Sequence, residues 1–440
     1  MIDAGRALQE FDIDIHDLSH DGRGVGRVDG KAVFVVGALP GERVRARATQ
    51  RKKQFDQATT TEVLRASPER VAPRCAHFGL CGGCALQHLD PAAQIAAKQR
   101  TLVENLQRIG QVQPERVLAP LTGPVWGYRR KARLGAKWVA KKERVLVGFR
   151  EAADPRFIAD IDRCEVLVPE VGARLGELSA LIQSLESRAA IPQIEVAAGD
   201  HGTALVLRHL QPLSEADRSA LRAFAAASGL HIMLQSGGVD SVLALDGEGP
   251  ELSFEVPHHR VSLRFEALDF IQVNRLLNEA MIDRALELLA LQPQHRVLDL
   301  FCGLGNFTLP IARRVREVIG VEGDAGLVRR ANQNAAANGL DNAHFHAADL
   351  VRELAGQPWM QERFDRVLID PPRTGAEEVI RAMDFATVPR LVYVSCHPGS
   401  LARDAGILVR EKGFRLAAAG VMDMFPHTAH VESIALFEKD

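Results

Sequence analysis

The fold is decided by the stretch Arg296-Val297-Leu298-Asp299-Leu300-Phe301-Cys302-Gly303-Leu304-Gly305-Asn306-Phe307. Its apolar first half is typical of a buried strand, which breaks into a glycine turn and restarts as a helix from Phe307. Strand, glycine turn and helix form the first unit of a nucleotide-binding α/β fold. The sequence therefore predicts a Rossmann-like domain, to which we assign residues 271–440.

Acidic residues stand where the following strands of this domain end. Strand 318–321 ends in Glu322, 19 residues after Gly303, where an acid can accept hydrogen bonds from a ribose diol. The third strand leads to Asp349, and the fourth ends in the run 370–373, Asp-Pro-Pro-Arg. A dinucleotide dehydrogenase would carry a third glycine near position 308, and none is there. The pattern looks instead like a methyltransferase that uses S-adenosylmethionine (SAM).

The fifth strand carries a cysteine at the sheet edge where ligands bind in such folds. Its apolar run, 391–394, stops at Ser395-Cys396, and Pro398 prevents an easy continuation. A free cysteine is most often a small buried apolar residue, and this alternative stands beside a catalytic one. Methyltransferases that act on exocyclic amines typically carry an aromatic residue where this chain has Arg373, which leaves a ring carbon as the target.

Methylation of a ring carbon explains why a thiol would be needed. A thiolate that adds to C6 of uracil makes C5 nucleophilic, and a base must then remove the C5 proton. Glu432 is an isolated acid in the apolar strand 431–437, and burial would raise its pKa and suit it to that role. The alternative for Glu432 is an exposed edge position. His430 is a rival base, and His397 a possible assistant.

Four cysteines outside this domain suggest a metal site. Cys75, Cys81 and Cys84 lie within ten residues, and Cys164 is the distant fourth. A thiol-only set suits zinc or an iron–sulfur cluster. Zinc sites usually contain two paired CxxC hooks, whereas this chain has one, so we favour a [4Fe–4S] cluster.

The N-terminal part predicts a small β-barrel. Short alternating strands separated by glycine turns fill residues 1–70, and such barrels commonly bind oligonucleotides. The stretch 19–26, Ser-His-Asp-Gly-Arg-Gly-Val-Gly, resembles a TRAM domain, an OB-like RNA-binding barrel. Residues 71–270 are expected to form a β-rich RNA-binding domain with the iron–sulfur insert, a helix over 91–110 and another helix near 214–228.

Composition narrows the class of protein. Net charge is only −2, which excludes a uniformly basic molecule, but six basic residues fall within 43–53 and eight within 129–144. With Tyr128 alongside, these runs favour phosphate contacts and base stacking, the alternative being a solvated face. Residues 1–6 lack a signal-peptide pattern and no apolar run is long enough to span a bilayer, so we expect a cytoplasmic protein.

Together these motifs resemble the RNA uracil-5-methyltransferase family. The matching stretches are 270–274, 299–308, 370–375, 393–396 and 425–432. The resemblance implies Cys396 as nucleophile and Glu432 as base. It implies SAM contacts from Gln272, Phe301, Asn306, Glu322, Asp349 and Asp370, and cluster ligation by Cys75, Cys81, Cys84 and Cys164. The chain departs from the family at His397, where Asn is common.

Domain content then narrows the substrate. A barrel and a cluster together resemble the members that methylate a conserved-core uridine of 23S rRNA, of the 1939 type, through a Cys–C6 intermediate. We expect 23S rRNA as partner, a monomer without an obligate protein partner, and no membrane association. The alternatives are the same chemistry on another rRNA or tRNA uridine, and a non-catalytic iron–sulfur RNA-binding protein.

Overall fold

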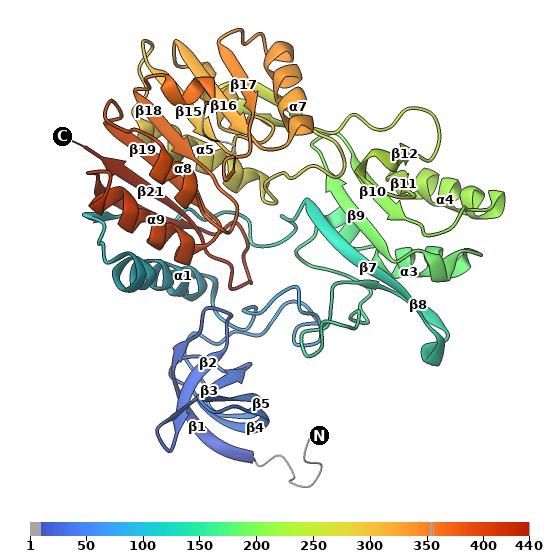
Figure 1. Ribbon diagram of the computed structural model, residues 1–440. Helices are drawn as coiled ribbons and strands as arrows, with labels where there is room; N and C mark the ends of the chain where they lie inside the picture. The colour runs from blue at the N-terminus through green and yellow to red at the C-terminus, as the bar shows by residue number, and fades with distance from the viewer. Residues whose placement is uncertain (1–9, 353, 355, 440) are drawn as a thin grey trace.

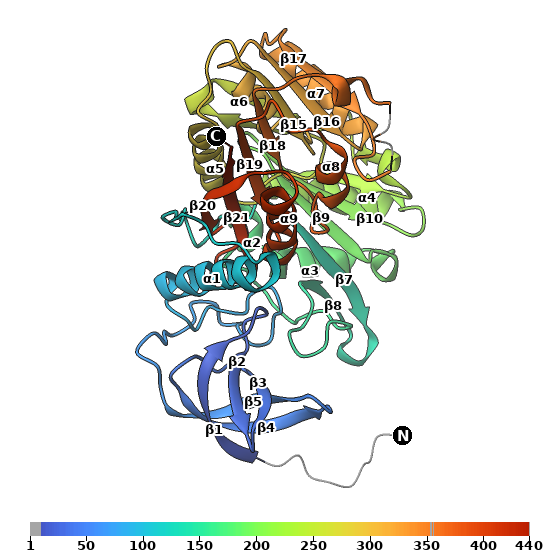
Figure 2. The same ribbon diagram turned by 60° about the vertical axis from the view of Figure 1, so that its left-hand side comes forward.

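The computed structural model describes residues 10–352, 354 and 356–439. A small barrel lies apart from a larger body built on two sheets, and helix α1 runs between the barrel and the C-terminal sheet in both views (Figures 1 and 2). The expectation of a chain without an export signal rests on residues 1–6, which lie outside the described range. No helix in that range is long and apolar enough to cross a membrane.

The N-terminal barrel confirms the TRAM-like prediction. It closes in the order β1-β2-β3-β5-β4, with β3 and β5 parallel and the other neighbours antiparallel. Alternate residues such as Ile13, Val33 and Val44 point inward and form its core. Gly26 is needed because any Cβ there would overlap the Ile13 side chain. The strands are β1 (Glu10–Leu18), β2 (Gly24–Val28), β3 (Lys31–Val36), β4 (Arg43–Arg51) and β5 (Phe55–Arg65).

The C-terminal sheet confirms the predicted Rossmann-like domain. It has eight strands in the order β17-β16-β15-β18-β19-β21-β20-β6, of which the first five are parallel. Successive residues of one strand enter different cores, since Leu391 and Tyr393 pack on one face and Val392 and Val394 on the other. Burial on both faces explains the continuous apolar runs. The strands are β6 (Arg116–Val117), β15 (Arg296–Leu300), β16 (Glu317–Glu322), β17 (Ala343–Ala347), β18 (Arg366–Ile369), β19 (Arg390–Ser395), β20 (Arg415–Met422) and β21 (Glu432–Glu438).

Helices cover both faces of this sheet. The described helices of the region are α5 (Arg275–Leu289), α6 (Thr308–Ala312), α7 (Ala325–Ala337), α8 (Glu377–Ala382) and α9 (Pro398–Arg410), with the 3-10 turn η6 (Pro358–Gln361). Figure 1 shows α8 and α9 on one side of the sheet and α5 on the other.

The middle of the chain forms a second sheet in the order β12-β11-β10-β9-β7-β8. The helix predicted near 214–228 is present and begins after the N-cap Ser214, whose hydroxyl accepts a hydrogen bond from the amide of Asp217. Helix α3 (Leu175–Ser184) was not predicted. The elements are β7 (Lys131–Val139), β8 (Arg144–Gly148), α2 (Pro169–Gly172), α3 (Leu175–Ser184), β9 (Gln193–Ala198), β10 (Thr203–Arg208), α4 (Glu215–Ser228), β11 (His231–Gln235), β12 (Val242–Ala244), the hairpin β13 (Ser253–Val256) and β14 (Val261–Arg264), and the 3-10 turns η2 (Ala140–Lys142), η3 (Arg188–Ala190), η4 (Val239–Ser241) and η5 (Pro257–His259).

One segment inside residues 71–270 joins the C-terminal sheet. Helix α1 (Pro91–Asn105) continues into the π-helical η1 (Leu106–Gly110) and contacts α9 and β20. Strand β6 then pairs in parallel with β20. The division of the chain at 70 and 270 stays a prediction, but α1 and β6 belong to the body that carries Cys396.

Candidate active site

The carboxyl edge of the parallel strands gathers most of the residues predicted to bind SAM. Phe301 follows β15 with φ +62°, a left-handed conformation rare outside glycine, and turns the chain into the glycine loop. Glu322 closes β16, where its carboxylate accepts hydrogen bonds from the amides of Gly303 (3.1 Å) and Asp324 (3.0 Å). The glycine loop is thereby tied to the second strand.

The other predicted SAM residues surround the same edge. Asn306 exchanges two amide hydrogen bonds of 2.9 Å with Asn278 of α5. Asp349 follows β17 and caps the next turn by accepting from the amide of Val351 at 2.9 Å. Gln272 precedes α5, and its carbonyl oxygen accepts from Arg130 Nε at 2.9 Å. Their predicted roles toward SAM are taken up below.

Two acids at this edge, Asp299 and Asp370, are costly to ionise. Burial raises the pKa of Asp370 to about 7, with Glu322 adding to the effect, and raises that of Asp299 to about 8. Thr308 donates a hydrogen bond of 2.5 Å to Asp299 Oδ2. Among the described residues nothing donates to Asp299 Oδ1. A positive group bound here would favour the ionised carboxylates.

Strand register brings Cys396 beside Glu432. Strands β19 and β21 are antiparallel and pair Ser395 with Ser433, so the next facing positions are Cys396 and Glu432. Facing residues of an antiparallel pair have Cβ atoms about 4.5–5.5 Å apart and point to the same side. β21 lies between β19 and β20, and Glu432 is only 8% exposed, so the edge-position alternative is wrong.

Both side chains have a raised pKa, for which burial is the largest cause. Burial raises the pKa of the Cys396 thiol to about 11, with Glu432 and Asp370 adding to it and Arg373 opposing it. Burial, helped by Asp370, raises the pKa of Glu432 to about 8, while Arg373 and Lys98 oppose the rise. The Glu432 carboxyl is therefore poised close to neutral pH, as a general base requires.

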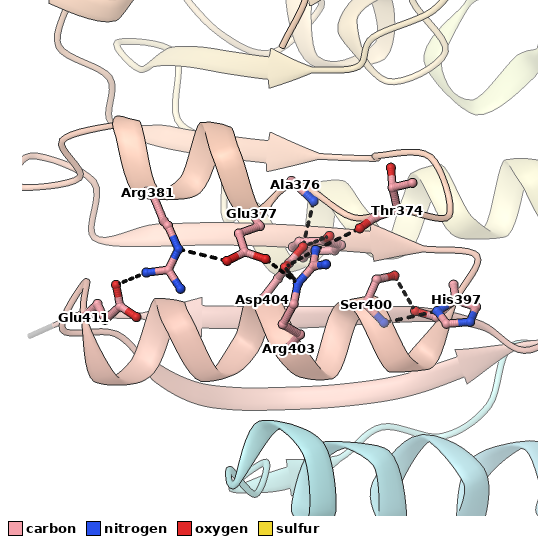
Figure 3. Close-up of polar contacts among 10 residues, drawn as sticks. Thr374, Ala376, Glu377, Arg381, His397, Ser400, Arg403, Asp404 and Glu411 are labelled. Atoms are coloured by element: carbon pink, nitrogen blue, oxygen red, sulfur yellow. Dashed lines mark hydrogen bonds and ion pairs between the residues drawn. The ribbon is translucent and has the colours of Figure 1, made fainter. Parts of the chain in front are cut away.

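Helix α9 is linked by polar contacts to the loop that follows β18 (Figure 3). Arg403 donates to the carbonyl of Thr374 (2.8 Å) and pairs with Glu377 (3.1 Å) and Asp404. Asp404 in turn accepts from the amide of Ala376 at 2.7 Å. The loop after β18 and the helix after Cys396 are thus held as one unit.

His397 has a capping role that explains its departure from the family pattern. Its Nδ1 accepts a hydrogen bond from the amide of Ser400 at 3.1 Å at the start of α9. An Asn side chain caps a helix with its oxygen in the same way. His430 is exposed, and its Nδ1 lies 3.1 Å from Arg373 Nη2. Partial burial and the Arg373 charge lower the pKa of His430.

Sequence reasoning missed a polar face of α1 that reaches this site. Lys98 is buried, forms a 2.7 Å ion pair with Asp423 and donates to the carbonyl of Phe425 at 2.9 Å. One turn earlier, Gln94 accepts from the amide of His427 at 2.9 Å. The available signal was a lysine on the helix face that carries the buried Ile95 and Leu102.

Cys396 lies in a cleft of about 1060 Å³. Its walls come from the barrel turn 20–23, from the cysteine-rich segment 78–85 and from 149–152. One end is formed by Arg373, Cys396 and the loop 428–431. Arg129 also lines this cleft. The cleft connects the barrel to the thiol, so a bound strand could contact both.

The predicted basic runs contribute less free charge than the sequence suggests. On β4, Arg43, Arg45 and Arg47 pair with acids of β1 at 2.7–3.3 Å. The solvated-face alternative fits that run better than a basic RNA-binding face. Tyr128 is buried and donates to the Pro426 carbonyl at 3.0 Å, so the predicted base stacking by Tyr128 is wrong.

The four cysteines predicted as ligands meet at one place. Cys75, Cys81, Cys84 and Cys164 line the same small cavity between the core clusters, and all are free thiols. Among the described residues, no group of three or more His, Cys, Asp or Glu is arranged to hold one metal ion. The iron–sulfur insert is therefore supported only in the convergence of its thiols.

Comparison with known proteins agrees with this geometry. The sequence model of tRNA (Uracil-5-)-methyltransferase matches residues 92–440, and that of the TRAM domain matches 8–59. A protein of Stenotrophomonas maltophilia named 23S rRNA (uracil(1939)-C(5))-methyltransferase RlmD is 60% identical over 98% of this chain and 97% of its own length. A protein of the same name from Xanthomonas euvesicatoria is 59% identical over the same shares.

A solved structure shares the fold. The tRNA (uracil-54, C5)-methyltransferase of Pyrococcus abyssi, in complex with S-adenosyl-L-homocysteine, superimposes with a TM-score of 0.71 at 23% identity and covers 97% of this chain and 100% of that one. With a family model over residues 92–440 and relatives near 60% identity, the chain belongs to the tRNA (uracil-5-)-methyltransferase family.

Proposed function

We propose that this protein methylates C5 of one uridine in 23S rRNA, of the 1939 type that its relatives' names state, with SAM as methyl donor. The observation that carries the proposal is the register of β19 and β21, which places Glu432 opposite Cys396, a residue that lines the cleft. A vestigial site would not need a buried carboxyl facing a thiol. Uridines of other RNAs are the alternative substrates.

SAM fits the acidic edge of the sheet. Gln272, Phe301, Asn306, Glu322, Asp349 and Asp370 are proposed to hold it. When bound, SAM supplies an electrophilic methyl group to C5 of the uracil. The support from this chain is the buried, partly unpartnered carboxyl of Asp299 and the raised pKa of Asp370, because a cation bound beside these acids would offset the cost of ionising them.

Cys396 is proposed as the nucleophile. Its proton leaves to solvent in the cleft, and the thiolate forms a bond to C6, which moves the C5=C6 electron pair onto C5 and O4. Arg373 is the nearby cation that favours the thiolate. After methylation, Glu432 accepts the C5 proton, the C5=C6 bond re-forms and the C6–S bond breaks, which returns Cys396 as thiolate.

The cleft is proposed to hold the RNA strand. A uracil in a folded RNA is stacked, so the target must turn out of the stack to reach Cys396. The barrel contributes its turn 20–23 to the cleft rather than the paired arginines of β4. Arg129, whose guanidinium lies over Phe149 (5.3 Å) and Phe425 (6.0 Å), is placed to contact a phosphate or a base.

Cys75, Cys81, Cys84 and Cys164 are proposed to bind a [4Fe–4S] cluster. The four thiols line one cavity, and four cysteine thiolates are the usual ligands of such a cluster. The single CxxC pair of the sequence favours it over zinc, whose sites usually contain two. A brown anaerobic preparation that absorbs visible light would support the cluster, and a colourless protein that holds zinc would refute it.

The substrate is tested by transfer of labelled methyl groups to 23S rRNA. We expect label in one 5-methyluridine, mapped by nuclease digestion and mass spectrometry, with the full-length protein. Transfer to tRNA alone would replace the proposed substrate. No transfer to either RNA by a protein with its iron retained would refute the proposed activity.

A further inference from the structure

The buried pair of Lys98 and Asp423 has no part in the mechanism above, although it lies beside the proposed base. Lys98 is 3% exposed on α1, and Asp423 is 3% exposed directly after β20. Removing two charges from water is costly and is repaid only by good geometry. The 2.7 Å ion pair and the 2.9 Å hydrogen bond to the Phe425 carbonyl supply that geometry.

The strand register places this pair next to Glu432. β20 and β21 are antiparallel and pair Met422 with Glu432, so Asp423 immediately follows the residue that faces Glu432. Lys98 therefore contacts the start of the loop 423–431, which connects β20 to β21. That loop also carries His430 into the cleft.

We propose, as an extension of the proposed function, that Lys98, held by Asp423, is a positioning residue that keeps Glu432 able to accept the C5 proton of the substrate uracil. Its ammonium group provides a fixed positive charge near Glu432, in addition to that of Arg373. Asp423 and the Phe425 carbonyl keep that ammonium oriented, so its charge does not move when RNA enters the cleft.

The charged groups around Glu432 show why a cation is needed there. The acidic neighbours of Glu432 are Asp370 and Cys396, and its basic neighbours are Arg373 and Lys98. Asp423 pairs with Lys98 and directly follows the residue that faces Glu432. Burial and Asp370 raise the pKa of Glu432 to about 8, and Lys98 opposes the rise. Without Lys98, the pKa of Glu432 would rise further and less carboxylate would be present at neutral pH.

The test separates methyl transfer from proton removal. Full-length protein with its iron retained is given 23S rRNA labelled with [5-³H]uridine and SAM labelled in its methyl group. Tritium release then reports loss of the C5 proton, and methyl label in the RNA reports the preceding step. The variant is Lys98→Met with Asp423→Asn, which removes both charges and leaves no buried unpaired one.

We expect the double variant to release tritium about tenfold more slowly at pH 7, which corresponds to a shift of about one pH unit in the release profile. The rate of tritium release should recover as pH rises, while the rate of methyl transfer stays unchanged. Near neutral pH a methylated protein–RNA adduct should accumulate. Gln94→Met is the matched control. This variant loosens the same loop without changing charge. It should slow both methyl transfer and tritium release and leave the pH dependence of tritium release unshifted.

A double variant that behaves like the Gln94 variant would overturn the proposal and give the ion pair a purely structural role. An unshifted, undiminished release profile would overturn it as well. Absence of methyl transfer in the unmodified protein would instead refute the proposed function, and this inference with it.

Discussion

Replacing Glu42 with Gln should loosen the barrel, because this carboxylate is fully buried and joins the barrel to the linker that follows it. Glu42 accepts hydrogen bonds from the amides of Leu39 (2.8 Å) and Ser67 (3.2 Å) and two from Arg70 at 2.5 and 2.8 Å. Arg70 also donates to the Gly37 carbonyl at 2.7 Å. Glutamine would keep one acceptor oxygen and bring an NH₂ group toward the guanidinium.

The magnitude follows from the burial of the pair. Breaking a buried ion pair by removing one partner costs about 3–5 kcal/mol, and the lower end applies because the Arg70 side chain is 23% exposed. A loss of about 3 kcal/mol in the free energy of unfolding lowers the hydrogen-exchange protection factors of the barrel amides about a hundredfold. Hydrogen–deuterium exchange with mass spectrometry should show this loss across β1–β5. Glu62→Gln is the control, because its exposed pairing with Arg45 is worth about 1 kcal/mol or less.

The effect of Glu42 should depend on pH. Burial alone would raise its pKa, but the hydrogen bonds from Arg70, Leu39 and Ser67 outweigh burial and the pKa is lowered. A lowered folded-state pKa gives stability that is full above the unfolded value of about 4.3 and is lost as pH falls through the folded value. The difference in barrel protection between the unmodified protein and Glu42→Gln should therefore become smaller as pH falls. Equal protection of the two proteins at pH 7, or a difference that grows as pH falls, would refute the reasoning.

Three further predictions concern the base, the cluster and helix packing. Glu432→Gln should allow methyl transfer but slow tritium release by about 10²–10⁴-fold, and prompt release would exclude Glu432 as base. Cys84→Ser should lose iron measured by visible absorption, whereas Cys302→Ser, outside the cysteine set, should retain it; equal retention would contradict the ligand assignment. Gly110→Ala should lower the free energy of unfolding in urea by about 1–3 kcal/mol, because a Cβ would overlap the Ala402 carbonyl of α9. Gly238→Ala, which has open space around it, should leave that free energy nearly unchanged.

The sequence predicted what local patterns encode. The run 296–307 combines an apolar strand, a glycine turn and a helix start, and each is a short-range signal that the structure confirms. Alternating polar and apolar residues and glycine turns likewise predicted the small barrel, which the structure confirms. Cys396 was singled out because it follows an apolar strand at the ligand-binding edge, and Glu432 because it is an acid in an otherwise apolar strand.

What the sequence did not reveal depends on contacts between distant segments. Lys98 and Asp423 are 325 positions apart, and neither is unusual until α1 lies against β20. The arginines of β4 formed a basic run, but the acids of β1 that neutralise them become neighbours only in the closed barrel. The sequence predicted that Tyr128 stacks on a base, because its burial depends on a contact with the distant loop at Pro426 that the sequence does not reveal.

The central claim, that Cys396 attacks C6 of a uracil, is tested most directly by trapping on 23S rRNA that contains 5-fluorouridine. Fluorine replaces the proton that Glu432 would remove, so the C6–S bond formed before methyl transfer should persist. We expect a covalent protein–RNA band in the presence of SAM that is absent with Cys396→Ala and that maps to one uridine. Methyl transfer to unsubstituted RNA without any such band, or an equal band with Cys396→Ala, would contradict the account.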